Sequence, residues 1–300
     1  MKVLKFGGSS LADAERYLRV KDICLDTHAT SGAAVVLSAP KGVTNALSLL
    51  CEEASSGKDY GELFAKLNMV LFGILDDLND TLPEFDDSKL APYIQKVLNE
   101  LNQHLEGFAL LRCAPESVVA KILSIGEYMS VNIFSQILTT LGTKNQIIDP
   151  AELILAEGDY LDSIADVAVS KARFSEVDSS GDVVLIMPGF VAVNAEGEKV
   201  TLGRNGSDYS AAILAACIGA ECCEIWTDVD GVYNADPNQV DGAVLLDKLT
   251  YQEAMELSYF GAKVLHPKTI GPIAQHHIPC LIRNTLNPAA PGTLISNEAS

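Results

Sequence analysis

Short, continuous runs of apolar residues constrain the fold of this chain more than any other feature of its sequence. Ala33–Ala39 reads AAVVLSA and Asp182–Met187 reads DVVLIM, and such runs are typical of parallel strands that are buried within a sheet. Val3–Phe6 is a further β-prone run, and Leu11–Thr27 after it carries apolar residues at helical intervals. The order strand, helix, strand indicates a βαβ unit, so the sequence predicts an α/β fold with a mainly parallel central sheet.

The composition narrows the function classes. The 300 residues are 48% hydrophobic, enough to bury a large core in one domain or in two closely joined lobes. A formal charge of −19 argues against a nucleic-acid partner, which needs a basic face. The seven cysteines form an odd set without C-x-x-C spacing, which favours reduced thiols and a cytoplasmic protein. No apolar stretch approaches the ~18 residues of a membrane span, and the scattered histidines predict no protein-built transition-metal site.

The stretch Val200–Ala220 predicts the end of a strand, a glycine-bearing loop and a helix. The first N–H groups of a helix have no partner within it, and the aligned peptide dipoles favour negative charge there. Gly206 and Ser207 can therefore donate to an anion, and the guanidinium of Arg204 adds a bidentate fork. An acid or a phosphate fits such a site. The alternative is structural, with Ser207 as a helix cap and Asp208 as a first-turn acid.

A second glycine loop follows the first predicted strand, in the sequence KFGGSS. Gly7 and Gly8 let the backbone approach a ligand closely, and loop N–H groups together with the Ser9 hydroxyl can hold phosphate oxygens. Lys5, just before the loop, adds a cation. The alternative is a tight turn beside an edge-strand lysine, because the sequence matches neither G-x-x-x-x-G-K-[ST] nor G-x-G-x-x-G.

Polar residues also lie at other places that this topology brings together. Ser38 ends the run Ala33–Ala39 and Thr44 lies in the loop after it, where ligands of parallel sheets gather; a strand end and a helix cap are the structural alternatives. Glu127 lies among apolar neighbours in a predicted helix, Glu116–Leu141. A buried carboxylate needs a partner, which is either a structural ion pair or a substrate group.

An acidic turn follows a later predicted strand. Asp228 and Asp230 precede Gly231, which superficially suggests a calcium loop. An EF-hand does not fit, because its first and twelfth positions would be Trp226 and Pro237, which carry no carboxylate. Solvated turn acids and a nucleotide-facing strand end remain the two interpretations.

In a chain of alternating strands and helices these loops are expected along one rim of the sheet. They combine two phosphate-capable glycine loops with a set of charged side chains: Lys5, Arg204, Lys263, Glu127, Asp208 and Asp228. This inventory suits phosphoryl transfer, because a loose transition state needs mainly the alignment of two anions and the neutralisation of their charge.

The sequence resembles a known family over nearly its whole length. The segments KFGGSS, SAP, GE, PGF, GRNGSD, WTDVDGVYNADP and GAKVLHP occur in the order and approximate spacing of the aspartokinases. GRNGSDYSAAILAA and YQEAMELSYFGAKVLHP look most like the kinase portion of a bifunctional aspartokinase/homoserine dehydrogenase. The resemblance implies the amino-acid kinase fold, an α/β/α sandwich with two lobes.

The resemblance also implies an activity. An aspartokinase transfers the γ-phosphoryl group of ATP, with Mg²⁺, to the side-chain carboxylate of L-aspartate, the first step toward threonine, methionine and lysine. The metal would be held largely by phosphates and water. Lys5 would neutralise charge in the transition state, and Asp208 would organise the phosphate and metal region. A homodimer in the cytoplasm is the family expectation.

Carried over residue by residue, the resemblance assigns three groups of site residues. The transferring phosphoryl group would be held by Lys5, Gly7, Gly8 and Ser9. The aspartate pocket would be formed by Ser38, Thr44, Glu127, Phe190, Arg204, Ser207 and Asp208. ATP would be contacted by Thr227, Asp228, Tyr233 and Lys263.

The expected organisation is an N-lobe over about residues 1–195 with the aspartate and phosphoryl site, and a C-lobe over about 196–300 with the ATP site. The regulatory ACT modules and the dehydrogenase half of the family are expected to be absent from this chain, so we expect no threonine feedback. Asn238 stands where many aspartokinases have an arginine after the Asp-Pro pair.

Other functions remain in competition with an aspartate kinase. A kinase for another acidic amino acid is the alternative within the same fold, and YQEAMELSYFGAKVLHP argues against it. A non-catalytic nucleotide or amino-acid sensor is favoured weakly by Asn238 and opposed by the retained Lys5, Glu127, Arg204 and Asp208. A nicotinamide-dependent dehydrogenase would need a glycine fingerprint that FGGSSLAD does not provide.

Overall fold

The computed structural model describes residues 1–235, 240, 242–259 and 265–298. Within them, eight strands form one sheet in the order β10-β12-β11-β9-β1-β2-β6-β3, and all are parallel to β1 except β12 and β10. The strands are β1 (Lys2–Phe6), β2 (Ala33–Leu37), β3 (Asn145–Ile147), β6 (Val184–Pro188), β9 (Cys223–Thr227), β10 (Lys248–Thr250), β11 (Cys280–Asn284) and β12 (Thr293–Ser296). The predicted α/β fold with a mainly parallel sheet is confirmed.

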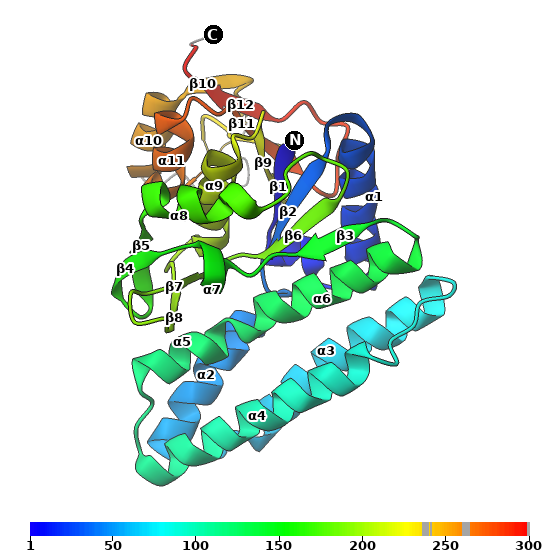
Figure 1. Cartoon of the computed structure of the whole chain (residues 1–300), viewed down its shortest axis with the longest axis vertical. Coiled ribbons are helices and arrows are strands. Elements are labelled where there is room, and N and C mark those ends of the chain that lie inside the picture. The colour runs from blue at the N-terminus through cyan, green and yellow to red at the C-terminus, as the bar shows by residue number, and fades with distance from the viewer. Residues whose placement is uncertain (236–239, 241, 260–264, 299–300) are drawn as a thin grey trace.

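Helices cover both faces of the sheet (Figure 1). One layer consists of α1 (Ala14–Ser31), α2 (Val43–Ser56), α3 (Gly61–Thr81), α4 (Leu90–Leu111), α5 (Glu116–Leu123) and α6 (Ile125–Thr140). The other contains α7 (Pro150–Leu153), α8 (Val167–Arg173), α9 (Gly206–Ile218), α10 (Tyr251–Tyr259) and α11 (Pro267–Gln275). In Figure 1, α3 and α4 lie beyond α6 on the side away from the sheet.

The alternation of side chains along β1 shows why the core has two halves. Leu4 and Phe6 are fully buried among the helices α1 to α6, whereas Val3 is buried on the opposite face with α9 and α11. Lys5 points to the same face as Val3, because side chains of a strand alternate between its two sides. The start of α9 therefore lies on the face to which Lys5 belongs.

Two short hairpins lie outside the main sheet. They are formed by β4 (Ala156–Asp159) with β5 (Asp162–Ala165), and by β7 (Val191–Val193) with β8 (Lys199–Thr201). The described part of the chain also contains two 3₁₀ turns. η1 (Gly8–Leu11) follows β1, and η2 (Phe174–Glu176) follows α8. None of the helices in the described ranges combines the length and apolar character that a bilayer crossing requires.

The predicted single helix Glu116–Leu141 is wrong in one respect, because it is two helices that meet at Ser124. The Ser124 hydroxyl donates to the carbonyl of Lys121 at 2.7 Å, and such back-bonding competes with the regular helical pattern. The break separates Leu123, at the end of α5, from Glu127, in the first turn of α6.

Candidate active site

A cavity of about 650 Å³ opens beyond the carboxyl ends of β1, β2 and β6. The loops after these strands are joined by backbone hydrogen bonds, from Ser38 N–H to the Phe6 carbonyl at 3.1 Å and from Gly189 N–H to the Leu37 carbonyl at 2.9 Å. Eleven residues predicted from the sequence line the cavity: Lys5, Gly8, Ser9, Ser38, Thr44, Glu127, Phe190, Arg204, Gly206, Ser207 and Asp208.

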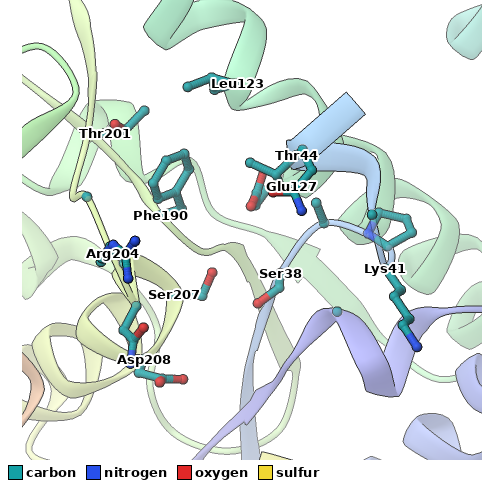
Figure 2. A pocket seen from close by; sticks show the side chains of 18 of the residues that line it. Ser38, Lys41, Thr44, Leu123, Glu127, Phe190, Thr201, Arg204, Ser207 and Asp208 are labelled. Carbon is teal, nitrogen blue, oxygen red and sulfur yellow. The ribbon is translucent and has the colours of Figure 1, made fainter. Parts of the chain in front are cut away.

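The lining forms two sides that face each other in Figure 2. Arg204, Ser207 and Asp208 lie on one side, in the loop before α9 and in its first turn. Ser38, Thr44 and Glu127 lie on the other, in the loop after β2, in α2 and in α6. Residues far apart in the sequence thus line one cavity. This agrees with the prediction that loops after parallel strands gather at one edge of the sheet.

Lys5 and Asp208, which both line the cavity, form a buried ion pair. Lys5 Nζ is 2.6 Å from Asp208 Oδ1, and the two side chains are only 11% and 12% exposed. Oδ1 accepts no well-aligned hydrogen bond from the described residues. The pair therefore keeps an ammonium and a carboxylate at the cavity with little water around them, where their interactions with a ligand are stronger than in bulk solvent.

The start of α9 is held close to the loop after β6. A side chain at Gly206, the first residue of α9, would place a Cβ 2.6 Å from the ring carbon Cδ2 of Phe190, so only glycine fits this approach. Phe190 itself has a φ of 70°, which is uncommon and strained for a bulky residue. Its N–H donates to the Ser210 hydroxyl of α9 at 2.9 Å, which helps to fix the backbone that carries the ring.

Glu127 is the carboxylate on the opposite side. It is 3% exposed, and its Oε2 has no hydrogen-bond partner among the described residues. Burial raises the pKa of Glu127 from 4.5 to about 8, with the backbone N–H groups of Glu127 and Ala39 holding it lower than burial alone would. The preceding Gly126 permits this position, because a Cβ there would lie 2.5 Å from the Cβ of Ala39. The sequence predicts that this buried carboxylate needs a partner, either an ion pair or a substrate group. The described residues supply no hydrogen-bond partner for Oε2.

The remaining predicted residues lie outside the cavity lining. Gly7 adjoins it, because a Cβ on Gly7 would be 3.3 Å from Lys5 Nζ. Thr227 ends β9, the strand beside β1, and its hydroxyl donates to Asp228 Oδ1 at 3.2 Å. Tyr233 pairs with Leu245 in an isolated β-bridge.

Two residues singled out in the sequence, Lys263 and Asn238, lie outside the described residues. In the described parts of the chain, no three His, Cys, Asp or Glu side chains gather in a way that would hold a metal ion.

The cavity also contains residues that sequence reasoning missed. Lys41 and Asn45 are in the loop and helix that carry Thr44, and Asn205 lies beside Arg204, so their position next to predicted residues was a usable signal. Leu161 had no such signal. It reaches the lining because its carbonyl accepts a 2.9 Å hydrogen bond from the Thr201 hydroxyl across two hairpins.

A sequence model of the amino acid kinase family matches residues 1–284. The chain belongs to the amino acid kinase family. It is 45% identical over 299 residues to the bifunctional aspartokinase/homoserine dehydrogenase of Buchnera aphidicola subsp. Acyrthosiphon pisum, covering 99% of this chain and 37% of that protein. It is 43% identical over 298 residues to the enzyme of the same name from Haemophilus influenzae, with 99% and 37% covered.

The solved structures agree with the sequence relatives. The crystal structure of Escherichia coli aspartokinase III in complex with aspartate and ADP superimposes with a TM-score of 0.90 at 31% identity. The match covers 100% of this amino acid kinase and 65% of that chain. The predicted resemblance to aspartokinases and the predicted amino acid kinase fold are both confirmed. The chain spans 37% of the length of the two bifunctional relatives.

Proposed function

We propose that this amino acid kinase is an aspartate kinase, which transfers the γ-phosphoryl group of ATP to the side-chain carboxylate of L-aspartate. The observation that carries the proposal is one cavity with the Arg204 guanidinium on one side and, on the other, the buried Glu127 Oε2, which has no hydrogen-bond partner among the described residues. A guanidinium and a carboxyl group that an arriving ammonium can ionise suit a substrate that bears two carboxylates and an ammonium. The similarity to an aspartokinase III that was crystallised with aspartate and ADP supports the same substrates.

Aspartate binding would use both sides of the cavity. Arg204 would hold a carboxylate through charge-assisted, bidentate hydrogen bonds, and Glu127 would accept from the substrate ammonium. Because burial raises the pKa of Glu127 to about 8, its carboxyl is largely protonated near neutral pH, and an arriving ammonium would favour loss of that proton. Four further residues would complete the pocket: Ser38, Thr44, Phe190 and Ser207.

The chemical step would take place near the ion pair. A carboxylate oxygen of aspartate would form a new bond to the γ-phosphorus as the bond from that phosphorus to the bridging oxygen of ADP breaks. Lys5 would neutralise the charge that develops on the phosphoryl oxygens. Gly7, Gly8 and Ser9 would orient the same oxygens through backbone N–H groups and a hydroxyl, while Asp208 would hold Lys5 in place.

The nucleotide would extend from this point toward the end of β9, where Thr227, Asp228 and Tyr233 lie, with Lys263 as a further proposed contact. Mg²⁺ is the metal that such a transfer requires. It is usually bound by one or two carboxylates together with substrate phosphates and water, so Asp208 at the cavity fits it as a protein ligand. When bound, the metal would neutralise phosphate charge.

The organisation around this activity is proposed on the same resemblance. We infer an N-lobe over about residues 1–195 and a C-lobe over about 196–300, a homodimer, and a role at the start of threonine, methionine and lysine biosynthesis. A cytoplasmic location is supported by the cysteines, all of which are free thiols in the described protein.

An ADP-release assay tests the proposed function. ADP release from ATP and Mg²⁺ should depend on added L-aspartate, and L-glutamate should give at most a small fraction of the rate. Turnover with glutamate and none with aspartate would replace the proposal by another acidic amino-acid kinase. Binding of aspartate and ATP without any turnover would indicate a sensor.

A further inference from the structure

A second cavity, of about 440 Å³, lies between α4, α5 and the turn of the β7–β8 hairpin. Its floor is apolar and consists of Val97, Leu101, Ile122 and Ile125, while His104 lies at its rim. None of these residues lines the first cavity. The volume falls within the range of small-molecule sites, which are mostly apolar with a few polar groups that orient the ligand.

The acids that line this second cavity already have partners. Glu198 accepts hydrogen bonds from the Tyr160 hydroxyl and, at 3.5 Å, from Asn194 Nδ2. Glu100 lies 3.8 Å from the ammonium of Lys96 in the preceding helical turn. Glu198 is thus held by neutral donors and Glu100 by Lys96, and the charge of Lys121 also helps to lower the pKa of Glu198.

Its lysines are in a different situation. Lys121 and Lys199 both line the cavity, and neither has a carboxylate oxygen within 4.0 Å among the residues that the structure describes. Lys199 Nζ lies 4.0 Å from the ring centroid of Tyr128, and the Tyr128 hydroxyl donates to Asp149 Oδ1 at 2.6 Å. The aromatic face stabilises the ammonium, and among the described residues the charge of Asp149 acts on it from beyond contact distance.

Lys199 is also partly removed from water. Burial lowers the pKa of its ammonium, the charge of Asp149 opposes that change, and the charge of Lys121 adds to it. A group in this position gains more from an arriving anion than a fully solvated surface lysine does, because part of its desolvation cost is already present in the folded protein.

We propose that this second cavity binds a small organic anion, a carboxylate with an apolar body, whose charged end meets Lys199 and Lys121 and whose body covers the apolar floor. The apolar floor favours such a molecule over inorganic phosphate. The cavity is distinct from the site proposed for aspartate and ATP.

The position of the cavity predicts a link to the first one. Helix α5 packs against β8, and each element contributes to both cavities. Ile122 lines the second cavity and Leu123 the first; Lys199 lines the second and Thr201 the first. A ligand that binds between α5 and β8 therefore fixes two walls of the first cavity relative to each other, and its differential affinity for the two arrangements shifts aspartate affinity. This link rests on the proposed function, whereas the binding itself does not.

Calorimetric titration of the whole chain with 4-phenylbutyrate tests the binding. The carboxylate should bind at least about tenfold more tightly than the neutral 4-phenylbutanamide, since the amide lacks the charge that the lysines recognise. Lys199→Met, which keeps an apolar stem over Tyr128, should weaken binding by about tenfold, and Lys121→Met should weaken it as well. Lys58→Met, at an exposed lysine elsewhere, should leave it unchanged.

Several results would overturn the proposal. They are no measurable binding of the carboxylate, equal binding of acid and amide, and equal affinity of Lys199→Met, Lys121→Met and Lys58→Met. Lys121 is exposed, so Lys121→Met should leave the fold intact. Its affinity for 4-phenylbutyrate therefore measures the contribution of a cavity lysine to binding even where Lys199→Met unfolds. Calorimetry needs no turnover and is independent of the proposed kinase activity. In the ADP-release assay, saturating 4-phenylbutyrate should change the KM for aspartate by about fivefold; an unchanged KM with intact binding removes the link alone.

Discussion

Strand β1 has a lysine near each end, and the two lysines pair with carboxylates in very different surroundings. Lys2 at the amino end lies 3.1 Å from Glu224, and Lys5 near the carboxyl end lies 2.6 Å from Asp208. Both carboxylates are buried. Lys5 and Asp208 line the 650 Å³ cavity, whereas Lys2 and Glu224 line neither of the two cavities described above. The two ion pairs can therefore be compared as one at a candidate site and one away from it.

Glu224 is satisfied by the protein alone. Besides Lys2, it accepts a hydrogen bond from Trp226 Nε1 at 3.1 Å and lies 3.9 Å from Arg283 NH1. The guanidinium of Arg283 in turn stacks on the Trp226 ring, 4.5 Å from its centroid. A carboxylate with this many partners is a structural element of the core.

The carboxylates at the cavity are incompletely paired. In the described part of the protein, Asp208 Oδ1 contacts the Lys5 ammonium but accepts no well-aligned hydrogen bond, and Glu127 Oε2 has no hydrogen-bond partner. Burial of a charge therefore does not distinguish a binding site from a core contact. An incompletely paired carboxylate beside a cavity does distinguish a binding site, because a ligand can supply the missing hydrogen-bond or charge partner.

Lys5→Ala against Lys2→Ala is the strongest test of this comparison. Lys5→Ala should lower aspartate-dependent ADP release by about 10²–10³-fold, the effect of losing one preorganised charge donor, while aspartate binding is largely kept. Lys2→Ala should leave turnover within about threefold, because its ion pair is far from the reacting groups. Equal losses in the two variants would contradict the distinction between the two ends of β1.

The pH dependence of stability sharpens the comparison at Glu127. The pKa of the Glu127 carboxyl is raised from 4.5 to about 8 in the folded protein. The contribution of the protonated carboxyl to the free energy of unfolding is therefore full below pH 4.5 and is lost as the pH rises through 8. Glu127→Gln should remove this loss. The variant's free energy of unfolding in urea should exceed that of the unmodified protein by on the order of 3 kcal/mol at pH 9 and by much less at pH 5. Parallel pH profiles for the two proteins would be inconsistent with a desolvated carboxyl.

Arg204→Met against Arg283→Met compares the two guanidinium groups. Arg204→Met should raise the KM for aspartate by about 10–100-fold, the loss expected for charge-assisted hydrogen bonds, with little change in melting temperature because Arg204 is exposed. Arg283→Met should lower the melting temperature and leave the KM unchanged. A reversed pattern in steady-state kinetics and thermal unfolding would exchange the two roles.

Glu224→Gln should give the smallest effect. Glutamine keeps an oxygen that can accept from Trp226 Nε1, and the Lys2 side chain is 34% exposed and can be hydrated, so we expect a loss of about 1–2 kcal/mol. We expect the melting temperature to fall by about 2–5 °C with turnover unchanged. Loss of turnover at an unchanged melting temperature would instead place Glu224 in the active site.

The rule that ligands gather beyond the carboxyl ends of parallel strands brought several of the predicted residues to one cavity, but Thr227 and Asp228, at the end of the parallel strand β9, lie outside its lining. Lys5, Ser9 and Ser38 meet at one cavity because the carboxyl ends of parallel strands lie at the same edge of a sheet. Arg204 joins them through the glycine loop that begins α9. The same argument could not predict Leu161, because this hairpin turn has no distinctive residues and is held at the cavity by long-range contacts, among them the hydrogen bond from the Thr201 hydroxyl 40 positions along the chain.

By itself, the sequence determined the parallel sheet, the two glycine loops and the family, because these depend on local periodicity and on short motifs. Only the tertiary structure decided which charges are neutralised. Lys2 and Lys5 are three positions apart on one strand, yet one is paired within the core and the other at a cavity. Within the described residues, the lack of a partner for Glu127 Oε2 and the lack of a carboxylate beside the Lys199 ammonium are likewise properties of long-range packing. The electrostatic environment of a group depends on neighbours that no local pattern records.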